Sequence, residues 1–294
     1  MGKFQVLTDS TSDVEKELRE SVGLDYINMV FTIEGIEYQA DLDWGKINPQ
    51  VYYDKMSKGN RSITGLAPFG NIEGKFRNYL EKGMDILFIA CSSKLSGTFN
   101  NAKIVADELL QEYPDRKIIC FDSLRSNYAE GLMALDAAKM AMEGKEIEEV
   151  VKYLEEYCLN YQVYATADNL NYLKLAGRVK ATTAFFGNLL GVKPIIVSDA
   201  KGNNYAFKKV KGRKNSLMEL AQIVKDRVIN PETATVFIEH ADALEDAMFI
   251  ASLIEGYVKN IHISYIGPII GATIGPQAIT ISLYGKKVEI ASEE

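Results

Sequence analysis

The chain has 294 residues, of which 47% are hydrophobic and 25% are charged, and its formal net charge is −7. This length suits one large α/β domain or two smaller domains, and we expect two. The negative charge argues against nucleic acid and anionic membrane surfaces as partners, since the most basic stretch, residues 207–214, is short.

The first part of the chain alternates predicted strands with predicted helices. Strands are expected at residues 4–7, 26–33, 36–39, 84–91 and 117–121. Helices are expected from the Ser12 and Glu15 capping box through residue 22, and at 49–58, 70–81, 98–110 and 128–142. Residues 61–70, which are rich in Gly and Pro, are expected to form a loop. Strands that alternate with helices favour a parallel sheet.

Hydroxyl-rich turns follow the predicted parallel strands. The central one carries Ser92, Ser93, Ser96, Gly97 and Thr98 between a buried strand and a helix. Such a turn directs N–H groups and hydroxyls at one point, which favours an anion, and it lies at the sheet edge where ligands usually bind. A plain Ser/Thr cap of the helix explains the same residues equally well.

The second part changes character. A helix at residues 146–161 is expected to join a domain of residues 1–160 to a domain of residues 161–294. Strands are expected at 162–167, 193–198, 205–210, 235–239, 262–266 and 279–284, and helices at 169–175, 216–228 and 243–258. This order predicts an α+β domain with a mixed sheet. Residues 182–190 are strongly apolar, and 266–276 are expected to form an apolar loop built on Gly and Pro.

Cysteine and histidine usage narrows the class of protein. The cysteines are far apart among apolar residues, which is typical of reduced core thiols in a cytoplasmic protein: Cys91, Cys120 and Cys158. Only His240 and His262 occur, so we expect neither a His-rich metal site nor a catalytic relay that needs several histidines. No cofactor is expected either. The chain begins on a predicted strand and holds no apolar run of membrane-spanning length, so neither a leader peptide nor stable membrane association is expected.

Five stretches, in this order, resemble the DegV family of bacterial fatty-acid-binding proteins. They are residues 8–13 (TDSTSD), 92–99 (SSKLSGTF), 122–123 (DS), 173–178 (LKLAGR) and 267–276 (GPIIGATIGP). The resemblance implies the two-domain fold shared with dihydroxyacetone kinase subunits. It also implies a long-chain fatty acid between the domains, with its carboxylate on hydroxyls and its tail in an apolar tunnel. Similar proteins present the acid to a separate ATP-dependent kinase, which makes an acyl phosphate for phospholipid synthesis.

The resemblance carries over to particular residues. Ser96 matches a carboxylate-binding serine, and Thr64 matches the threonine that opens the family's Thr-Ser-Gln-Pro loop, which here reads Thr-Gly-Leu-Ala-Pro. The family's His-x-Gly-Pro-Gly reads Thr273-Ile-Gly-Pro-Gln277, so the histidine of the head-group network is replaced by threonine. Fatty-acid binding remains the expectation, while the use of a partner kinase and the type of ligand stay open.

The expected site therefore has two parts. The carboxylate is assigned to the hydroxyls of Ser96 and Thr64 and to the N–H groups of Gly97 and Thr98, since two or three charge-assisted bonds of about 1.5–3 kcal/mol each suffice. Thr273 and Arg178 are further head-group candidates, although Arg178 also fits a partner-facing charge or a helix C-cap. The tunnel is assigned to Leu66, Phe69, Phe185, Phe186, Leu189, Ile269, Ile270 and Ile274, with Val30, Phe31 and Leu190 as further candidates.

Two other functions remain open at this stage. One is a kinase or phosphotransferase subunit for a small hydroxylated ligand, which the missing histidine and the absence of an Asp cluster beside a glycine loop disfavour. Asp9 and Asp122 are possible acid–base groups for it, but each is better explained as a cap of the following helix. The other is a sensor that binds a different apolar acid. We expect a lipid carrier and not an enzyme.

Overall fold

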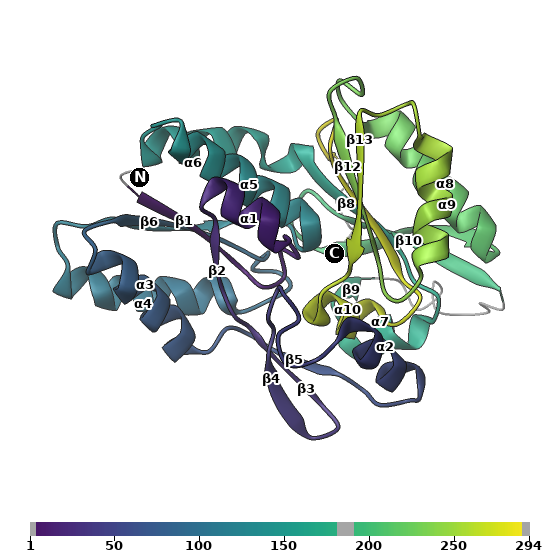
Figure 1. Cartoon of the computed structure of the whole chain (residues 1–294), viewed down its shortest axis with the longest axis horizontal. Coiled ribbons are helices and arrows are strands. Elements are labelled where there is room, and N and C mark those ends of the chain that lie inside the picture. The colour runs from purple at the N-terminus through teal and green to yellow at the C-terminus, as the bar shows by residue number, and fades with distance from the viewer. Residues whose placement is uncertain (1–3, 181–190, 290–294) are drawn as a thin grey trace.

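The structure, a computed structural model, describes residues 4–180 and 191–289. A four-stranded parallel sheet forms one end of the molecule, in the order β2-β1-β6-β7 (Figure 1). Its strands are β1 (Phe4–Asp9), β2 (Asp25–Ile27), β6 (Asp85–Ala90) and β7 (Ile118–Asp122). Its helices are α1 (Lys16–Val22), α3 (Phe69–Leu80), α4 (Thr98–Glu112), α5 (Asn127–Met142) and α6 (Ile147–Tyr157). Helices α3 and α4 lie on one face, and α1, α5 and α6 lie on the other.

A small antiparallel sheet, in the order β4-β3-β5, lies beside this one. Its strands are β3 (Val30–Ile33), β4 (Ile36–Gln39) and β5 (Ile63–Gly65). The single strand predicted at residues 26–33 is therefore wrong, because β2 joins the parallel sheet and β3 joins this one. The loop predicted at 61–70 is also corrected, since its β-branched residues Ile63 and Thr64 pair with β3.

A seven-stranded mixed sheet, in the order β13-β12-β14-β8-β10-β11-β9, forms the other end. Its strands are β8 (Tyr161–Thr166), β9 (Val179–Lys180), β10 (Val192–Ser198), β11 (Asn204–Lys211), β12 (Thr235–His240), β13 (Asn260–Tyr265) and β14 (Ile279–Tyr284). Helices α8 (Arg213–Arg227) and α9 (Leu244–Ile254) cover one face. The predicted combination of a parallel sheet and a mixed sheet is confirmed.

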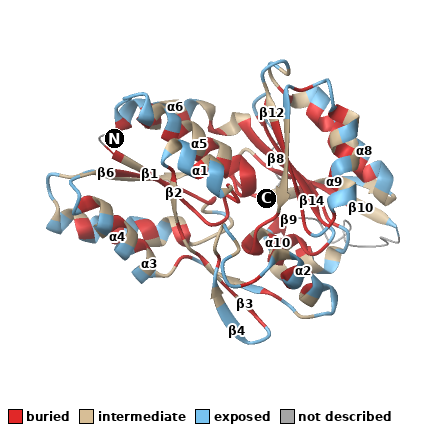
Figure 2. Ribbon diagram, viewed as in Figure 1, coloured by how far each residue is buried: buried red, intermediate tan, exposed pale blue. Residues whose placement is uncertain are grey.

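Helix α5 lies between the two large sheets and contacts β1 and β6 on one side and β8 and β14 on the other. Its sequence is rich in Ala and Met on every face, which is typical of a helix that is buried all round. Gly131 allows the tightest approach, because a Cβ there would lie 2.5 Å from the Ser12 carbonyl oxygen. Figure 2 shows the buried residues concentrated on the strands and on the helix faces turned toward them.

Three short helices gather beside the small sheet: α2 (Pro49–Ser57), α7 (Leu170–Ala176) and α10 (Pro268–Ile274). The loop predicted at residues 266–276 is wrong, because these residues contain α10. Pro268 occupies the first helical turn, where its missing N–H costs nothing, and Gly275 ends the helix with a φ of 83°. The Gly and Pro residues thus mark the two ends of a helix.

The start of α1 also differs from its prediction. Its N-cap is Glu15, and the hydroxyl of Ser12 has no hydrogen-bond partner within the described residues. Ser12 instead belongs to a buried turn that packs against Gly131 of α5. The predicted domain boundary at residue 160 falls in the one-turn 3-10 helix Cys158–Asn160, just before β8, and it stays a prediction.

Candidate functional site

A cavity of about 310 Å³ lies between the carboxyl ends of the parallel strands and the seven-stranded sheet. Thr11 after β1, Cys91 after β6 and Ser126 before α5 contribute to one wall, and residues of β8, β10 and β14 contribute to the opposite wall. A position at the carboxyl ends of parallel strands is the usual ligand site of such sheets. The volume is at the lower end of the ~300–1,000 Å³ range of small-molecule pockets.

Ser96 is the hydroxyl around which one end of the cavity is built. Its Oγ accepts a hydrogen bond from the N–H of Thr98 at 3.2 Å and lies 3.0 Å from Thr98 Oγ1. Thr98 is fully buried, and its Oγ1 accepts from the N–H of Ala67 at 3.1 Å. The expected contact of Thr98 with a ligand stays a prediction, although its N–H already donates to Ser96 and the residue is absent from the cavity lining. Thr98 holds Ser96 in place.

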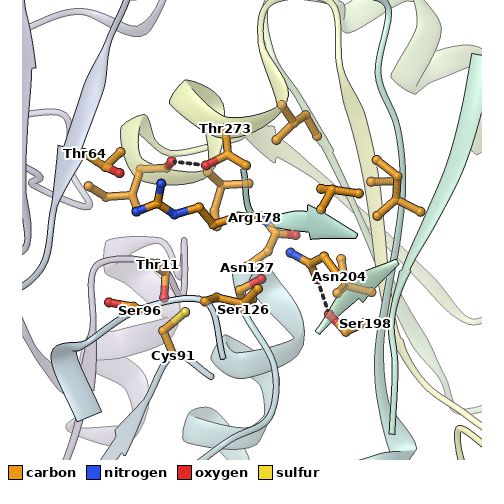
Figure 3. Close-up of a pocket in the computed structure, with 18 of the residues that line it drawn as sticks. Thr11, Thr64, Cys91, Ser96, Ser126, Asn127, Arg178, Ser198, Asn204 and Thr273 are labelled. Atoms are coloured by element: carbon orange, nitrogen blue, oxygen red, sulfur yellow. Dashed lines mark hydrogen bonds between the residues drawn. The ribbon is translucent and has the colours of Figure 1, made fainter. Parts of the chain in front are cut away.

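The other predicted head-group residues lie at the mouth of the cavity. Thr64, Arg178 and Thr273 line both the cavity and a smaller hollow beside it (Figure 3). Arg178 is exposed, donates to the Ala176 carbonyl oxygen at 2.5 Å and extends toward the two threonines. The structure thus brings Thr64, Ser96, Arg178 and Thr273 to one region, together with Gly97, which also lines the cavity.

Most of the described tunnel candidates also line the cavity. Leu66, Ile269, Ile270 and Ile274 do so, and α10 supplies the three isoleucines. Sequence reasoning missed further apolar lining residues, among them Met29, Leu95, Val163, Leu173, Ile196 and Val197. Leu95 and Leu173 lie in the 92–99 and 173–178 stretches, where apolar residues were not singled out, and Val163, Ile196 and Val197 belong to buried strands, as core residues do.

Three tunnel candidates do not line the cavity. Phe69 begins α3, is 50% exposed and lies outside the lining, so its assignment to the tunnel stays a prediction without support from the cavity. Val30 and Phe31 of β3 are also absent from the lining, and Phe31 packs against Tyr38 and Tyr52 in the core. Phe185, Phe186, Leu189 and Leu190 lie outside the described residues.

The inner part of the cavity is more polar than the sequence indicated. It is lined by Thr11, Ser126, Asn127, Ser198, Asn204 and Thr280, none of which was predicted. Thr11 lies in the 8–13 turn that was singled out, and Ser126 and Asn127 follow the 122–123 pair. The last three are single polar residues in strands of the mixed sheet, where no local pattern marks them.

Buried carboxyl groups surround this polar floor. The hydroxyl of Thr11 lies 2.6 Å from an oxygen of Asp9 and 2.6 Å from an oxygen of Glu130, both fully buried. One hydroxyl proton can serve only one of these contacts, so the other requires a proton on a carboxyl group. Burial raises the pKa of both carboxyl groups, in agreement with this geometry.

A second buried carboxyl pair joins the two halves of the chain. The Asn127 amide donates to Asp13 at 2.9 Å and to Glu239 at 3.1 Å, and Thr280 donates to Glu239 at 2.9 Å. Burial raises the pKa of Asp13 to about 8, and burial with the neighbouring Asp13 raises that of Glu239. A proton held by this pair lowers the negative charge beneath the cavity.

Asp9 and Asp122 do not cap helices as predicted. Asp9 accepts from the N–H groups of Thr11 and Cys91, both at 2.9 Å, and Asp122 accepts from those of Ser93 and Leu124, both at 3.1 Å. Both carboxylates brace the turns that follow the strands, so they hold the cavity wall in shape. Within the described ranges, no group of three or more His, Cys, Asp or Glu side chains can hold a metal ion.

The structure also shows the state of the cysteines and the character of the helices. Cys91, Cys120 and Cys158 are free thiols; Cys91 lines the cavity, and burial raises its pKa. Among the helices of residues 4–180 and 191–289, none combines the length and apolar character needed to cross a membrane.

Comparisons with known proteins agree with this fold. A family model described as "Uncharacterised protein, DegV family" matches residues 3–286. A DegV domain-containing protein of Clostridium perfringens is 36% identical over 291 residues, which are 98% of this chain and 100% of that protein. Among solved structures, DegV of Bacillus subtilis, described as a fatty acid binding protein, is 28% identical with a TM-score of 0.83, covering 97% of this chain and 100% of that one.

A DegV family protein from Thermus thermophilus, whose structure is described by its fatty acid binding, is 25% identical. Its TM-score is 0.84, and the match covers 97% of this chain and 100% of that one. The resemblance inferred from the five stretches is thereby confirmed.

Proposed function

The chain belongs to the DegV family, and from this premise we propose that it binds one long-chain fatty acid between its two halves. The carboxylate lies at Ser96 and Thr64, and the tail lies along the apolar wall. The observation that carries the proposal is a single cavity that joins a hydroxyl-lined mouth to isoleucines and other apolar side chains. The fatty acid binding described for the relatives of Bacillus subtilis and Thermus thermophilus supports the same choice.

The hydrogen bonds at Ser96 suit a carboxylate. When Thr98 donates its N–H and its hydroxyl proton to Ser96 Oγ, the proton of Ser96 is left for a ligand. The Thr64 hydroxyl makes no hydrogen bond within the described residues and lines the same region. Charge-assisted bonds of this kind contribute about 1.5–3 kcal/mol each, and Arg178 at the mouth adds favourable charge.

The apolar wall accounts for selectivity toward a long chain. Burial of about 14 methylenes at roughly 0.8 kcal/mol each gives about 11 kcal/mol before costs. Association and ordering cost about 4–15 kcal/mol, so useful affinity needs a preformed apolar pocket. Leu66, Leu173 and Ile274 belong to such a wall, and α10 and α7, which carry two of them, pack against each other.

Native mass spectrometry of the purified protein, followed by organic extraction, tests the proposal. We expect a stoichiometric mass increment that resolves to long-chain fatty acids. A protein that is empty as purified and that ignores added acids would contradict the proposal. It would instead favour an enzyme that acts on a small hydroxylated ligand.

We further propose a partner: a separate ATP-dependent kinase that takes the carboxylate at the cavity mouth. Arg178 and Arg61 line the hollow beside the mouth, where a partner can reach them. Thr273 replaces the family histidine, so the test compares the natural chain with Thr273→His. Acyl phosphate formed with a bacterial fatty acid kinase and ATP supports this role, and its absence with both proteins contradicts it.

A further inference from the structure

Ser126 has an unusual environment for a serine at the start of a helix. It is the N-cap of the 16-residue helix α5, where a serine hydroxyl normally accepts from a helical N–H. Its hydroxyl makes no such bond, although the residue is only 4% exposed and lines the cavity. The next residue, Asn127, has a φ of 59°, so the chain turns sharply here and the hydroxyl faces the cavity.

Asn204 offers an unused donor from the opposite side. Its Oδ1 accepts a hydrogen bond from Ser198 at 2.7 Å, and within the described residues its amide nitrogen has no acceptor. Figure 3 shows this nitrogen directed toward Ser126 and Asn127. Because Ser126 precedes α5 and Asn204 begins β11, the two groups approach the cavity from different halves of the chain.

The neighbouring polar groups are already paired. The Asn127 amide serves Asp13 and Glu239, and the Thr280 hydroxyl serves Glu239. These residues therefore form a satisfied floor and do not compete for a ligand. The Ser126 hydroxyl therefore remains available to accept a hydrogen bond from a ligand, and the Asn204 amide remains available to donate one.

Ser126 also lies deeper than the head-group residues, whereas Asn204 is partly exposed. Ser126, Ser198 and Thr280 are 4%, 1% and 2% exposed, whereas Thr64, Ser96 and Thr273 at the mouth are partly exposed and Arg178 is exposed. The one cavity connects both places. An acyl chain with its carboxylate at the mouth would pass the inner pair along its length.

We propose that Ser126 and Asn204 form a second subsite, which binds a hydroxyl group carried along the acyl chain. This inference rests on the proposed function, because it needs an acyl chain in the cavity. A hydroxyl accepts from Asn204 and donates to Ser126, so both protein groups are satisfied. A second carboxylate does not fit, because among the described residues that line the cavity the only cation is Arg178 at the mouth, and buried acidic groups lie beneath the inner part.

The test compares palmitic acid with a series of its monohydroxy isomers, in which the hydroxyl moves along the chain. In a purely apolar tunnel, an unpaired hydroxyl weakens binding by about 5- to 100-fold at every position. We expect one isomer to bind at least as tightly as palmitic acid. Ser126→Ala and, independently, Asn204→Ala should each lower the affinity of that isomer relative to palmitic acid by about tenfold.

The matched control is Ser96→Ala, which removes a hydroxyl at the mouth and should weaken both acids by the same factor. If every isomer binds more weakly than palmitic acid and Ser126→Ala leaves the ratio unchanged, the subsite holds water alone and the inference is wrong. If palmitic acid fails to bind while one isomer binds, the result supports the subsite and contradicts binding of an unsubstituted acid. Failure of all acids overturns both proposals.

Discussion

The contact between the hydroxyls of Ser96 and Thr98 determines whether the Ser96 hydroxyl can donate a hydrogen bond to a ligand. Thr98 is pinned by the N–H of Ala67 and lies against Ser96 Oγ, so the serine hydroxyl is oriented before any ligand arrives. Fixing the donor in advance lowers the ordering cost of binding. The sequence alone pointed to both residues but could not separate the contacting hydroxyl from the supporting one, because adjacent hydroxyls look alike in a motif.

Ser96→Ala tests this division of roles. We expect the variant to bind a long-chain fatty acid about tenfold or more weakly, because a carboxylate loses one charge-assisted bond of about 1.5–3 kcal/mol. The fatty alcohol of equal length should change much less, since it carries no charge. Isothermal titration calorimetry measures both affinities. An equal loss for acid and alcohol would remove Ser96 from the carboxylate site.

Asp13 gives a pH-dependent prediction at the same scale. Burial raises its pKa from 3.8 to about 8, so the folded state holds a proton that the unfolded state releases. This contribution to stability is complete below about pH 4 and is lost as the pH rises through about 8. Asp13→Asn should flatten that decline by up to about 1.4 kcal/mol per pH unit, because asparagine does not ionise. Asparagine also tolerates the φ of 53° at this position.

Urea unfolding of the natural chain and Asp13→Asn across this pH range checks the prediction. The remaining slope reports Glu239, Asp9 and Glu130, whose pKa values burial also raises. Two parallel curves would show that Asp13 does not hold the proton.

Between elements, α10 depends on two tyrosines of α2 that are distant in sequence. Tyr52 donates to the Pro268 carbonyl oxygen at 2.8 Å, and Tyr53 donates to that of Ile266 at 2.5 Å. Gly271 lets Tyr53 pack closely, since a Cβ there would lie 2.3 Å from the tyrosine oxygen. A wall of the cavity is thereby fixed by a helix that does not line it.

Tyr53→Phe should lower the free energy of unfolding by about 1–3 kcal/mol, because a buried carbonyl loses its donor. Affinity for a fatty acid should fall as well, since α10 carries Ile269, Ile270 and Ile274. The control is Tyr257→Phe, whose hydroxyl also donates to a carbonyl, that of Lys225, but at a residue that is 40% exposed. Tyr257→Phe should change both quantities little. An unchanged affinity in Tyr53→Phe would show that α10 does not need this anchor.

Local sequence predicted elements well where one pattern decides the structure. The apolar run of β6 and the helical spacing of α4 depend on neighbouring residues, and both elements form as expected. The segment that forms α10 was predicted to be a loop, because Gly and Pro occur both in loops and at the two ends of a helix. Its true state depends on Tyr52 and Tyr53, more than 200 residues away.

At the scale of the molecule, Arg125 ties the two halves together from inside. It is fully buried and donates to the carbonyl oxygens of Tyr161 at 2.6 Å and Asp199 at 2.9 Å. Burial lowers its pKa to about 10, so it remains a cation at neutral pH. Nothing in the sequence around Arg125 marks it as buried, since arginine is usually exposed. The polar cavity floor escaped prediction for the same reason: its members meet only in the folded chain.

Strand β14 lies inside the mixed sheet, between β12 and β8, although it is the last strand in the described part of the chain. Before it is in place, β12 and β13 have no link to the strands from β8 to β9, and Thr280 is missing from the cavity. On the ribosome, the parallel sheet can form early, while the binding site cannot exist until Tyr284 has emerged. If the proposed ligand binds in this cavity, we expect a nascent chain to bind it only after β14 has paired with β12 and β8.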